Sequence, residues 1–130
     1  MKYEFIPKPL DAYKDEVKAE VDAVVEKLRL RFVTPGSAQA MVYVEKEAEA
    51  RAFSAGSTEA IPHITLEAEE TGQSVTQLAS IVVMMADRWK LVSARLEAKR
   101  QGVKKQISEA TDHSGVTLAA KVDWEAVING

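Results

Sequence analysis

Residues 74–110 read SVTQLASIVVMMADRWKLVSARLEAKRQGVKKQISEA, and this run decides the fold. Ser74 and Gln77 have the S-x-x-Q spacing of a capping box, in which each side chain accepts a hydrogen bond from a backbone N–H at a helix start. Gly72, two residues earlier, suits the left-handed residue that ends a preceding helix. The sequence therefore predicts one uninterrupted helix over residues 74–110, about 54 Å long at the standard rise per residue.

Apolar residues in this run recur at alternating steps of four and three, with one position skipped at Lys99. This spacing is typical of a heptad seam, the stripe along which a helix packs on its neighbour in a coiled coil. A helix of this length exceeds what a compact fold of 130 residues needs, so the pattern favours a role in assembly. The seam consists of Leu78, Val82, Met85, Trp89, Val92, Leu96, Val103, Ile107 and Ala110.

The composition favours helices over sheets. Hydrophobic residues make up 46% of the chain and charged residues 28%, which is ordinary for a folded protein. Alanine supplies much of the apolar content, and aromatic residues are limited to three Phe, three Tyr and two Trp. Such a composition favours closely packed helices over a β-sandwich. The predicted fold class is all-α, a helical bundle built on the long helix with an extended N-terminal arm.

The remaining sequence divides into this arm and several shorter helices. Pro7 and Pro9 disfavour helix, so residues 1–9 are predicted to be extended. Tyr3 and Phe5 make the arm apolar and are expected to dock it on its own bundle or on a neighbour. Residues 10–130 are predicted to form one helical domain, with shorter helices over about 10–32, 38–53, 62–71 and 116–128.

Two segments of the first half carry further expectations. Four valines lower the helix propensity of residues 10–32, so a strand over residues 21–33 stays open as an alternative. Residues 34–37, Thr-Pro-Gly-Ser, predict a tight turn in which Ser37 caps the following helix. The residues of that helix expected to face inward are Met41, Val44, Ala48 and Ala52.

The distribution of charge limits the kinds of partner. A net charge of −3 argues against a general nucleic-acid binder. Residues 87–105 nevertheless contain seven basic side chains against two acidic ones, and residues 45–70 contain seven acidic side chains against two basic ones. We interpret the basic cluster as a solvated face, with docking on an acidic partner as the alternative. Nucleic acid is disfavoured because no aromatic residues interleave the cluster for base stacking.

No motif in the sequence indicates chemistry. Cysteine is absent, which excludes disulfides, thiolate nucleophiles and zinc–thiolate sites. His63 and His113 are the only histidines, and neither has the spacing of a metal-ligand set. We therefore expect no enzymatic activity, no metal or other cofactor and no small-molecule substrate. Since the sequence lacks a long apolar run and a signal peptide, we also expect no membrane association.

The order of several motifs resembles a known group of proteins. Residues 27–43, KLRLRFVTPGSAQAMVY, precede EKEAEARAF at 45–53, then TGQSV at 71–75 and Trp89, and the segment from Ile107 to Trp124 closes the pattern. This order resembles small, largely uncharacterised α-helical proteins of tailed bacteriophages that accompany virion and tail components. The resemblance implies a structural or assembly role and assigns no catalytic residues.

Together, the helix pattern and the resemblance predict a phage virion-associated structural protein of the tail or of a fibre attachment. It would pack through its helices on copies of itself and on other phage structural proteins, and would lie in the virion and, during assembly, in the host cytoplasm. A non-virion chaperone for tail or tail-fibre assembly is the alternative, followed by a small host-modulating binder. The candidate interaction residues are Leu78, Val82, Met85, Trp89, Val92 and Leu96 on the long helix, with Tyr3 and Phe5 on the arm.

Overall fold

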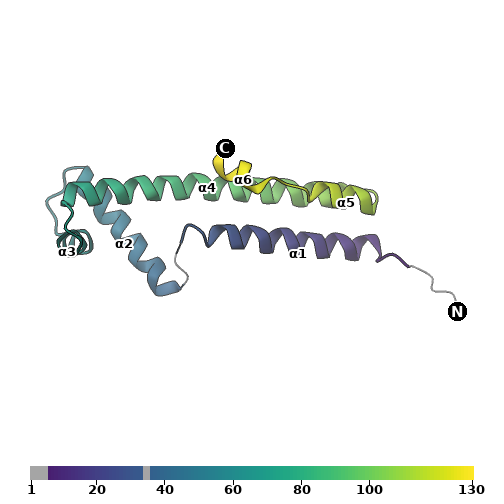
Figure 1. Ribbon diagram of the computed structural model, residues 1–130, viewed down its shortest axis with the longest axis horizontal. Coiled ribbons are helices and arrows are strands. Elements are labelled where there is room, and N and C mark those ends of the chain that lie inside the picture. The colour runs from purple at the N-terminus through teal and green to yellow at the C-terminus, as the bar shows by residue number, and fades with distance from the viewer. Residues whose placement is uncertain (1–5, 34–35) are drawn as a thin grey trace. The chain divides into compact units, whose positions relative to one another are not determined.

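The computed structural model describes residues 6–33 and 36–130, and its regular structure over these residues is entirely helical (Figure 1). This confirms the predicted all-α class, and the strand alternative at 21–33 is wrong because the helix there continues to Arg29. The helices of the described residues are, in chain order, α1 (Leu10–Arg29), α2 (Ser37–Ser54), α3 (Pro62–Thr71), α4 (Val75–Glu109), α5 (His113–Ala119) and α6 (Trp124–Asn129).

The prediction of one long helix is confirmed by α4, whose observed ends lie within one residue of the predicted ones. The capping box is present in both directions. The backbone N–H of Gln77 donates to Ser74 Oγ at 3.0 Å, and the backbone N–H of Ser74 donates to Gln77 Oε1 at 3.2 Å. Gly72 ends α3 in the left-handed conformation, with φ of 70°. Local sequence signals therefore fix where α3 stops and where α4 begins.

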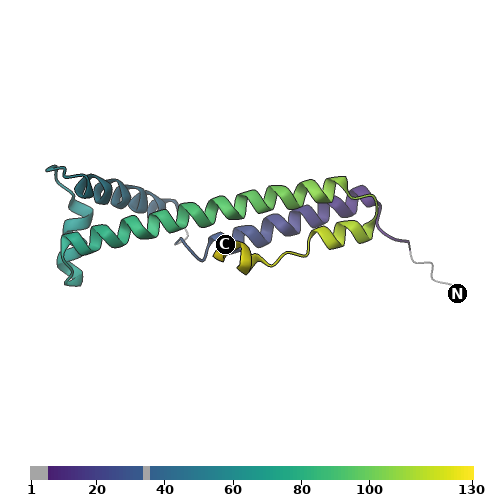
Figure 2. The ribbon, with the colours of Figure 1, turned by 90° about the horizontal axis from the view of Figure 1, so that it is seen from above.

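The chain divides into two compact units, and α4 contributes residues to both. Unit 1 consists of residues 1–29 and 92–130, so it contains α1, the second part of α4, α5 and α6. Within this unit α1 lies alongside α4, and α5 lies beside α1 (Figure 2). Its buried apolar side chains are Val17, Val21, Val25 and Leu28 of α1, Val92, Leu96, Val103 and Ile107 of α4, Val116 of α5 and Ile128 of α6.

The C-terminal segment of unit 1 differs from its prediction. A single helix over 116–128 was expected, but the structure has the two short helices α5 and α6. Each begins at an aspartate that caps it. Asp112 accepts a hydrogen bond from the backbone N–H of Gly115 at 2.7 Å, and Asp123 accepts one from that of Ala126 at 3.1 Å. The signal that could have divided this segment is therefore the pair of N-cap aspartates.

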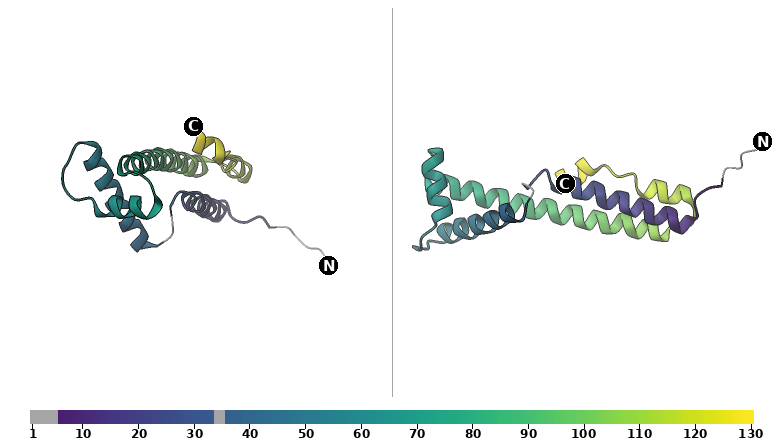
Figure 3. Two further views of the ribbon diagram at one scale, coloured as in Figure 1. Left: turned by 60° about the vertical axis from the view of Figure 1, so that its left-hand side comes forward. Right: turned by 90° about the horizontal axis from the view of Figure 1, so that it is seen from below.

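Unit 2 consists of residues 30–91 and contains α2, α3 and the first part of α4. Helix α3 runs across the beginning of α4 rather than along it (Figures 1 and 3). The buried core of this unit is small and comes from all three helices. Around it lie the partly buried Phe53, Ile61, Val75, Val82 and Val83. The buried members themselves are Ala50 of α2, Ile64 and Ala68 of α3, and Leu78 and Ala79 of α4.

The turn before α2 differs from its prediction by one residue. Thr34 and Pro35 lie outside the described residues. Gly36 occupies the N-cap position of α2 with φ of 116°, a conformation that favours glycine. Ser37 is therefore the first residue of the helix and not its cap. The glycine, rather than the serine, is the residue of this turn that the backbone requires.

Replacing two glycines of the chain by alanine should have opposite effects on stability. Gly102 lies within α4, has no positive φ and has open space where a Cβ would lie. Gly102→Ala should raise the free energy of unfolding by about 0.5–1 kcal/mol because alanine loses less backbone entropy in a helix. Gly72→Ala should lower it by about 1–2 kcal/mol because φ there is left-handed. Urea denaturation of both variants measures the two changes, and changes of the same sign would contradict this account.

Candidate protein-interaction site

Helix α2 directs charged side chains toward α3. Lys46 Nζ donates to Glu67 Oε1 of α3 at 2.6 Å, and this lysine is largely covered. Glu49 accepts a hydrogen bond from the backbone N–H of Ile64 at 3.1 Å, near the start of α3. Ala50, one helical turn after Lys46 and on the same side of α2, is fully buried. The side of α2 that faces its own unit therefore combines a small apolar residue with flanking charges.

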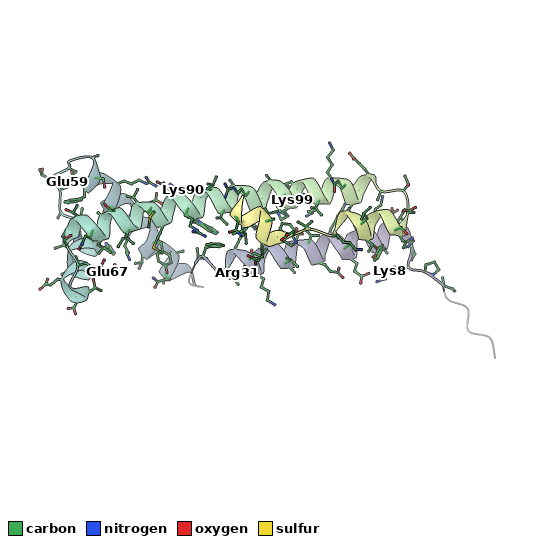
Figure 4. All side chains as sticks on the ribbon, turned by 45° about the horizontal axis from the view of Figure 1, so that its top comes forward. Lys8, Arg31, Glu59, Glu67, Lys90 and Lys99 are labelled. Carbon is green, nitrogen blue, oxygen red and sulfur yellow. The ribbon has the colours of Figure 1, made fainter. Side chains whose placement is uncertain are left out.

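The contact of α2 with α4 is also polar. Glu47 of α2 accepts a hydrogen bond from Lys90 Nζ of α4 at 2.9 Å, and Arg51 Nη2 donates to Asp87 Oδ1 at 2.6 Å. Arg51 also donates to Glu47 within α2 at 3.1 Å. The hydrogen bonds from Lys90 and Arg51 lower the pKa of Glu47. These ion pairs fix α2 on α4, and Lys90 projects from α4 in Figure 4.

One apolar row of α2 is exposed. Met41 is 70% exposed and Val44 is 68% exposed, and Ala48 is exposed as well. Met41 lies about 180° around the helix from the buried Ala50. The prediction that Met41, Val44 and Ala48 face inward is therefore wrong. The physical reason is that α3 and α4 present charges that pair with the other side of α2.

The first part of α4 also carries apolar side chains that its own unit does not cover. Met84 is 64% exposed, Met85 is 62% exposed and Ile81 is 40% exposed. Their spacing of i, i+3 and i+4 places them on one side of the helix, which is the side away from the buried Ala79. We call these two exposed rows the open face of unit 2; each row lies on the side of its own helix that is turned away from the core. It consists of Met41, Val44 and Ala48 of α2, and Ile81, Met84 and Met85 of α4.

The predicted interaction residues differ in how far the structure buries them. Leu78, Val92 and Leu96 are buried within the chain's own units, whereas Met85 is exposed. Val82 and Trp89 are half-buried, and the Trp89 ring lies 6.1 Å from the ring of Phe32, centroid to centroid. Tyr3 and Phe5 lie outside the described residues. Of the predicted residues that are described, Met85 alone is exposed enough to offer most of its side chain to a partner.

Sequence reasoning missed Met41, Val44, Ile81 and Met84 as candidate interaction residues. A strict heptad seam drifts by about 20° per heptad around a straight α-helix, so one stripe cannot describe the packed side along all of α4. In unit 2 the packed side has shifted to include Ala79 and Val83. The opposite side, with Ile81 and Met84, is left open. A helical wheel drawn for residues 75–91 alone could have identified this open apolar side of the helix.

Much of the basic cluster is used within the chain rather than left in water. Besides Lys90, Arg100 Nη1 donates to Asp22 Oδ1 of α1 at 2.8 Å, and Lys104 Nζ donates to Asp22 Oδ2 at 3.1 Å. Arg88 and Lys99 are exposed and form no ion pair within the described residues. The interpretation of the basic cluster as a solvated face therefore fits only some of its residues. One of these is Lys99, which is labelled in Figure 4.

Carboxylates of unit 1 form a network that links α1 to α4. Glu97 accepts hydrogen bonds from Arg100, Gln101 and Arg29, and these hold its pKa at about 2. The hydrogen bond from Arg100, assisted by Lys104, lowers the pKa of Asp22. A carboxyl group whose pKa is lowered by folding stabilises the folded state above its unfolded pKa. That contribution is lost as the pH falls through the folded pKa.

Removing these carboxylates should make the stability of the chain less sensitive to acid. Asp22→Asn with Glu97→Gln should lower the melting temperature at neutral pH because the Arg100 contacts are lost. The difference from the parent should shrink as the pH falls from about 5 through 2, because the parent carboxylates are increasingly protonated over that range. Thermal unfolding followed by circular dichroism at each pH measures this. Glu20→Gln, an exposed change on α1, is the control, and a constant difference across the pH range would contradict the network.

The part of the chain that the structure describes contains no candidate metal site. There, no group of three or more His, Asp or Glu side chains could hold a metal ion. His63 Nδ1 contacts Glu49 Oε2, and His113 Nε2 contacts the backbone oxygen of Lys8. Across the described helices, none is both long and apolar enough to span a membrane.

Comparison of the chain with known proteins gives no match. No protein-family model, no curated protein and no solved structure is significantly similar to it. The resemblance to tailed-phage proteins therefore stays a prediction, and the function must be argued from the geometry of the chain itself.

Proposed function

We propose that this chain is an assembly protein that works by packing the open face of unit 2 against other helices. No catalytic step is part of this proposal. The single observation that carries it is the orientation of α2, whose Lys46 and Glu47 pair with its own unit while Met41 and Val44 face water. A helix with its apolar side outward gains stability when another surface covers that side.

The balance of energies supports this reading. Ion pairs between partly exposed side chains contribute only about 0–1 kcal/mol each. Burying a large apolar side chain that was exposed contributes about 1.5–3 kcal/mol. The open face has five large apolar side chains, of which Met41, Val44, Met84 and Met85 are each more than three-fifths exposed. Covering them therefore offers more stabilisation than the ion pairs beneath supply.

The proposal takes its biological setting from the resemblance. We place the chain in the virion of a tailed bacteriophage, in the tail or at a fibre attachment, and in the host cytoplasm during assembly. Its partners would be copies of itself and other structural proteins of the particle. A long helix with exposed apolar rows in its first part suits such a role, because large exposed apolar surfaces mark sites of protein–protein interaction.

A second candidate function is that of a chaperone that binds a tail or tail-fibre protein transiently and is absent from the particle. The observation that favours it is the methionine content of the open face. Met41, Met84 and Met85 are the methionines of the chain other than Met1, and all three are exposed. Methionine adapts to irregular surfaces and is common at binding sites that accept several partners.

Quantitative mass spectrometry of purified particles separates these functions. The virion protein should be present at a fixed number of copies per particle. Absence from particles, together with recovery on a tail or fibre protein in infected cells, would favour the chaperone. Absence from both would end the two proposals.

The role of the open face is testable by charge insertion. Val44→Glu with Met84→Glu should leave the helical content unchanged because both side chains are exposed. Incorporation into particles should fall at least about tenfold, the change that accompanies a loss of about 1.4 kcal/mol in binding. Leu118→Glu is the matched control, because Leu118 is 69% exposed but belongs to unit 1. Equal incorporation of the two variants would contradict the assignment of the open face.

A further inference from the structure

We infer that α2 and α3 form a single lid on the first part of α4, and that Glu49 of α2 makes the start of α3 depend on α2. The lid consists of residues 37–71, and its two helices detach from α4 together while α4 keeps its own helical start. This inference concerns the packing inside unit 2. It therefore does not depend on what covers the exposed rows of α2 and α4.

Helix α3 has no side-chain cap at its own N-cap position. The first backbone N–H groups of a helix have no partner within the helix and need an acceptor from outside it. The N-cap residue of α3 is Ile61, whose side chain has no acceptor, and Pro62 after it has no N–H. The next exposed demand is the N–H of Ile64. Because Ile64 is fully buried, this N–H needs an acceptor from the protein.

Glu49 of α2 supplies that acceptor. Its Oε1 accepts a hydrogen bond from the backbone N–H of Ile64 at 3.1 Å. Its Oε2 accepts one from Nδ1 of His63, the residue before. Only 11% of the Glu49 side chain is exposed. One side chain of α2 therefore holds the first turn of α3 through both the backbone and a side chain.

The same side of α2 makes further contacts with α3 and with the core. Lys46 Nζ donates to Glu67 Oε1 of α3 at 2.6 Å. Ala50 is buried in the core that α2 shares with α3, and Phe53 packs against that core. The spacing i, i+3, i+4 and i+7 places four residues on this side of the helix: Lys46, Glu49, Ala50 and Phe53.

Helix α3 is too short to be stable without these contacts. It has ten residues, and isolated helices shorter than about 12–15 residues are marginal in water. Its buried residues, Ile64 and Ala68, lie in the core that Ala50 of α2 helps to form. When α2 detaches, α3 loses its cap, its ion pair at Glu67 and part of its core. Helix α3 therefore detaches with α2.

The start of α4 needs no such support. Ser74 and Gln77 cap it reciprocally, over a separation of three residues. This cap stays in place when the lid detaches. The detached lid uncovers Leu78 and Ala79 of α4, which the closed unit buries. Release of α2 is thus a single local event that exposes apolar surface hidden in the closed unit.

Hydrogen exchange of the full chain, followed by NMR at each amide, tests the cap. Glu49→Ala should speed exchange throughout α2 and α3 by at least about tenfold, because the buried N–H of Ile64 loses its acceptor. Glu49→Gln keeps an oxygen that can accept this hydrogen bond and should stay within about threefold of the parent. Glu45→Ala, the same kind of change at an exposed position of α2, should have no effect.

A change on α4 tests whether α2 and α3 open together. Asp87→Asn with Lys90→Gln removes ion pairs that hold α2 on α4, and among the described residues neither side chain pairs with α3. Exchange should speed up by about two- to fivefold in α2, since exposed ion pairs contribute little. It should speed up by the same factor in α3. Arg88→Gln, an exposed change on the same helix, is the control.

The exchange rates can contradict the inference in three ways. Parent rates at Ile64 in Glu49→Ala would show that Glu49 is not the cap of α3. Faster exchange in α2 with parent rates in α3, in the variant changed on α4, would show that the two helices open separately. Equal acceleration at Leu78 and Ala79 of α4 would show that unit 2 opens as a whole and has no lid.

Discussion

Helix α4 is the element on which every other part of the structure depends, because it supplies core residues to both units. Leu78 and Ala79 belong to the core of unit 2, and Val92, Leu96, Val103 and Ile107 are buried in unit 1. A helix that packs different neighbours along its length cannot bury one straight stripe throughout. The side that each unit covers determines which apolar residues of α4 are left exposed, and in unit 2 the large ones are Ile81, Met84, Met85 and Leu91.

The elements that the sequence predicts well are those whose ends are set by local chemistry. The capping box at Ser74 and Gln77 and the left-handed Gly72 each act within a few residues, so they identify the boundary between α3 and α4 without knowledge of the fold. The division of the tail into α5 and α6 is local too, since Asp112 and Asp123 cap the two helices. That division was missed because the apolar spacing of residues 116–128 was given more weight than the aspartates.

The direction in which α2 faces could not be predicted in the same way. Its apolar row is visible in the sequence, but the choice of which side turns inward depends on what the neighbouring helices present. Glu67 on α3 and Lys90 on α4 pair with Lys46 and Glu47, residues that lie far from them in the sequence. The candidate site was missed for the same reason. Tertiary partners decide which apolar side is open, and no local pattern reports them.

The orientation of α2 also limits the possible explanations for its exposed apolar row. Salt bridges at a partly exposed surface contribute little to stability. Each Å² of apolar surface that stays exposed instead of being buried loses about 25 cal/mol of stabilising free energy. The observed orientation buries Ala50 and packs Phe53 against the core of unit 2, and it leaves Met41 and Val44 exposed. The charged contacts of Glu47 and Arg51 give α2 one defined orientation, and that orientation keeps the apolar row outside. Packing against other helices, as proposed, would bury this row and so add a stabilising contribution that the isolated unit lacks.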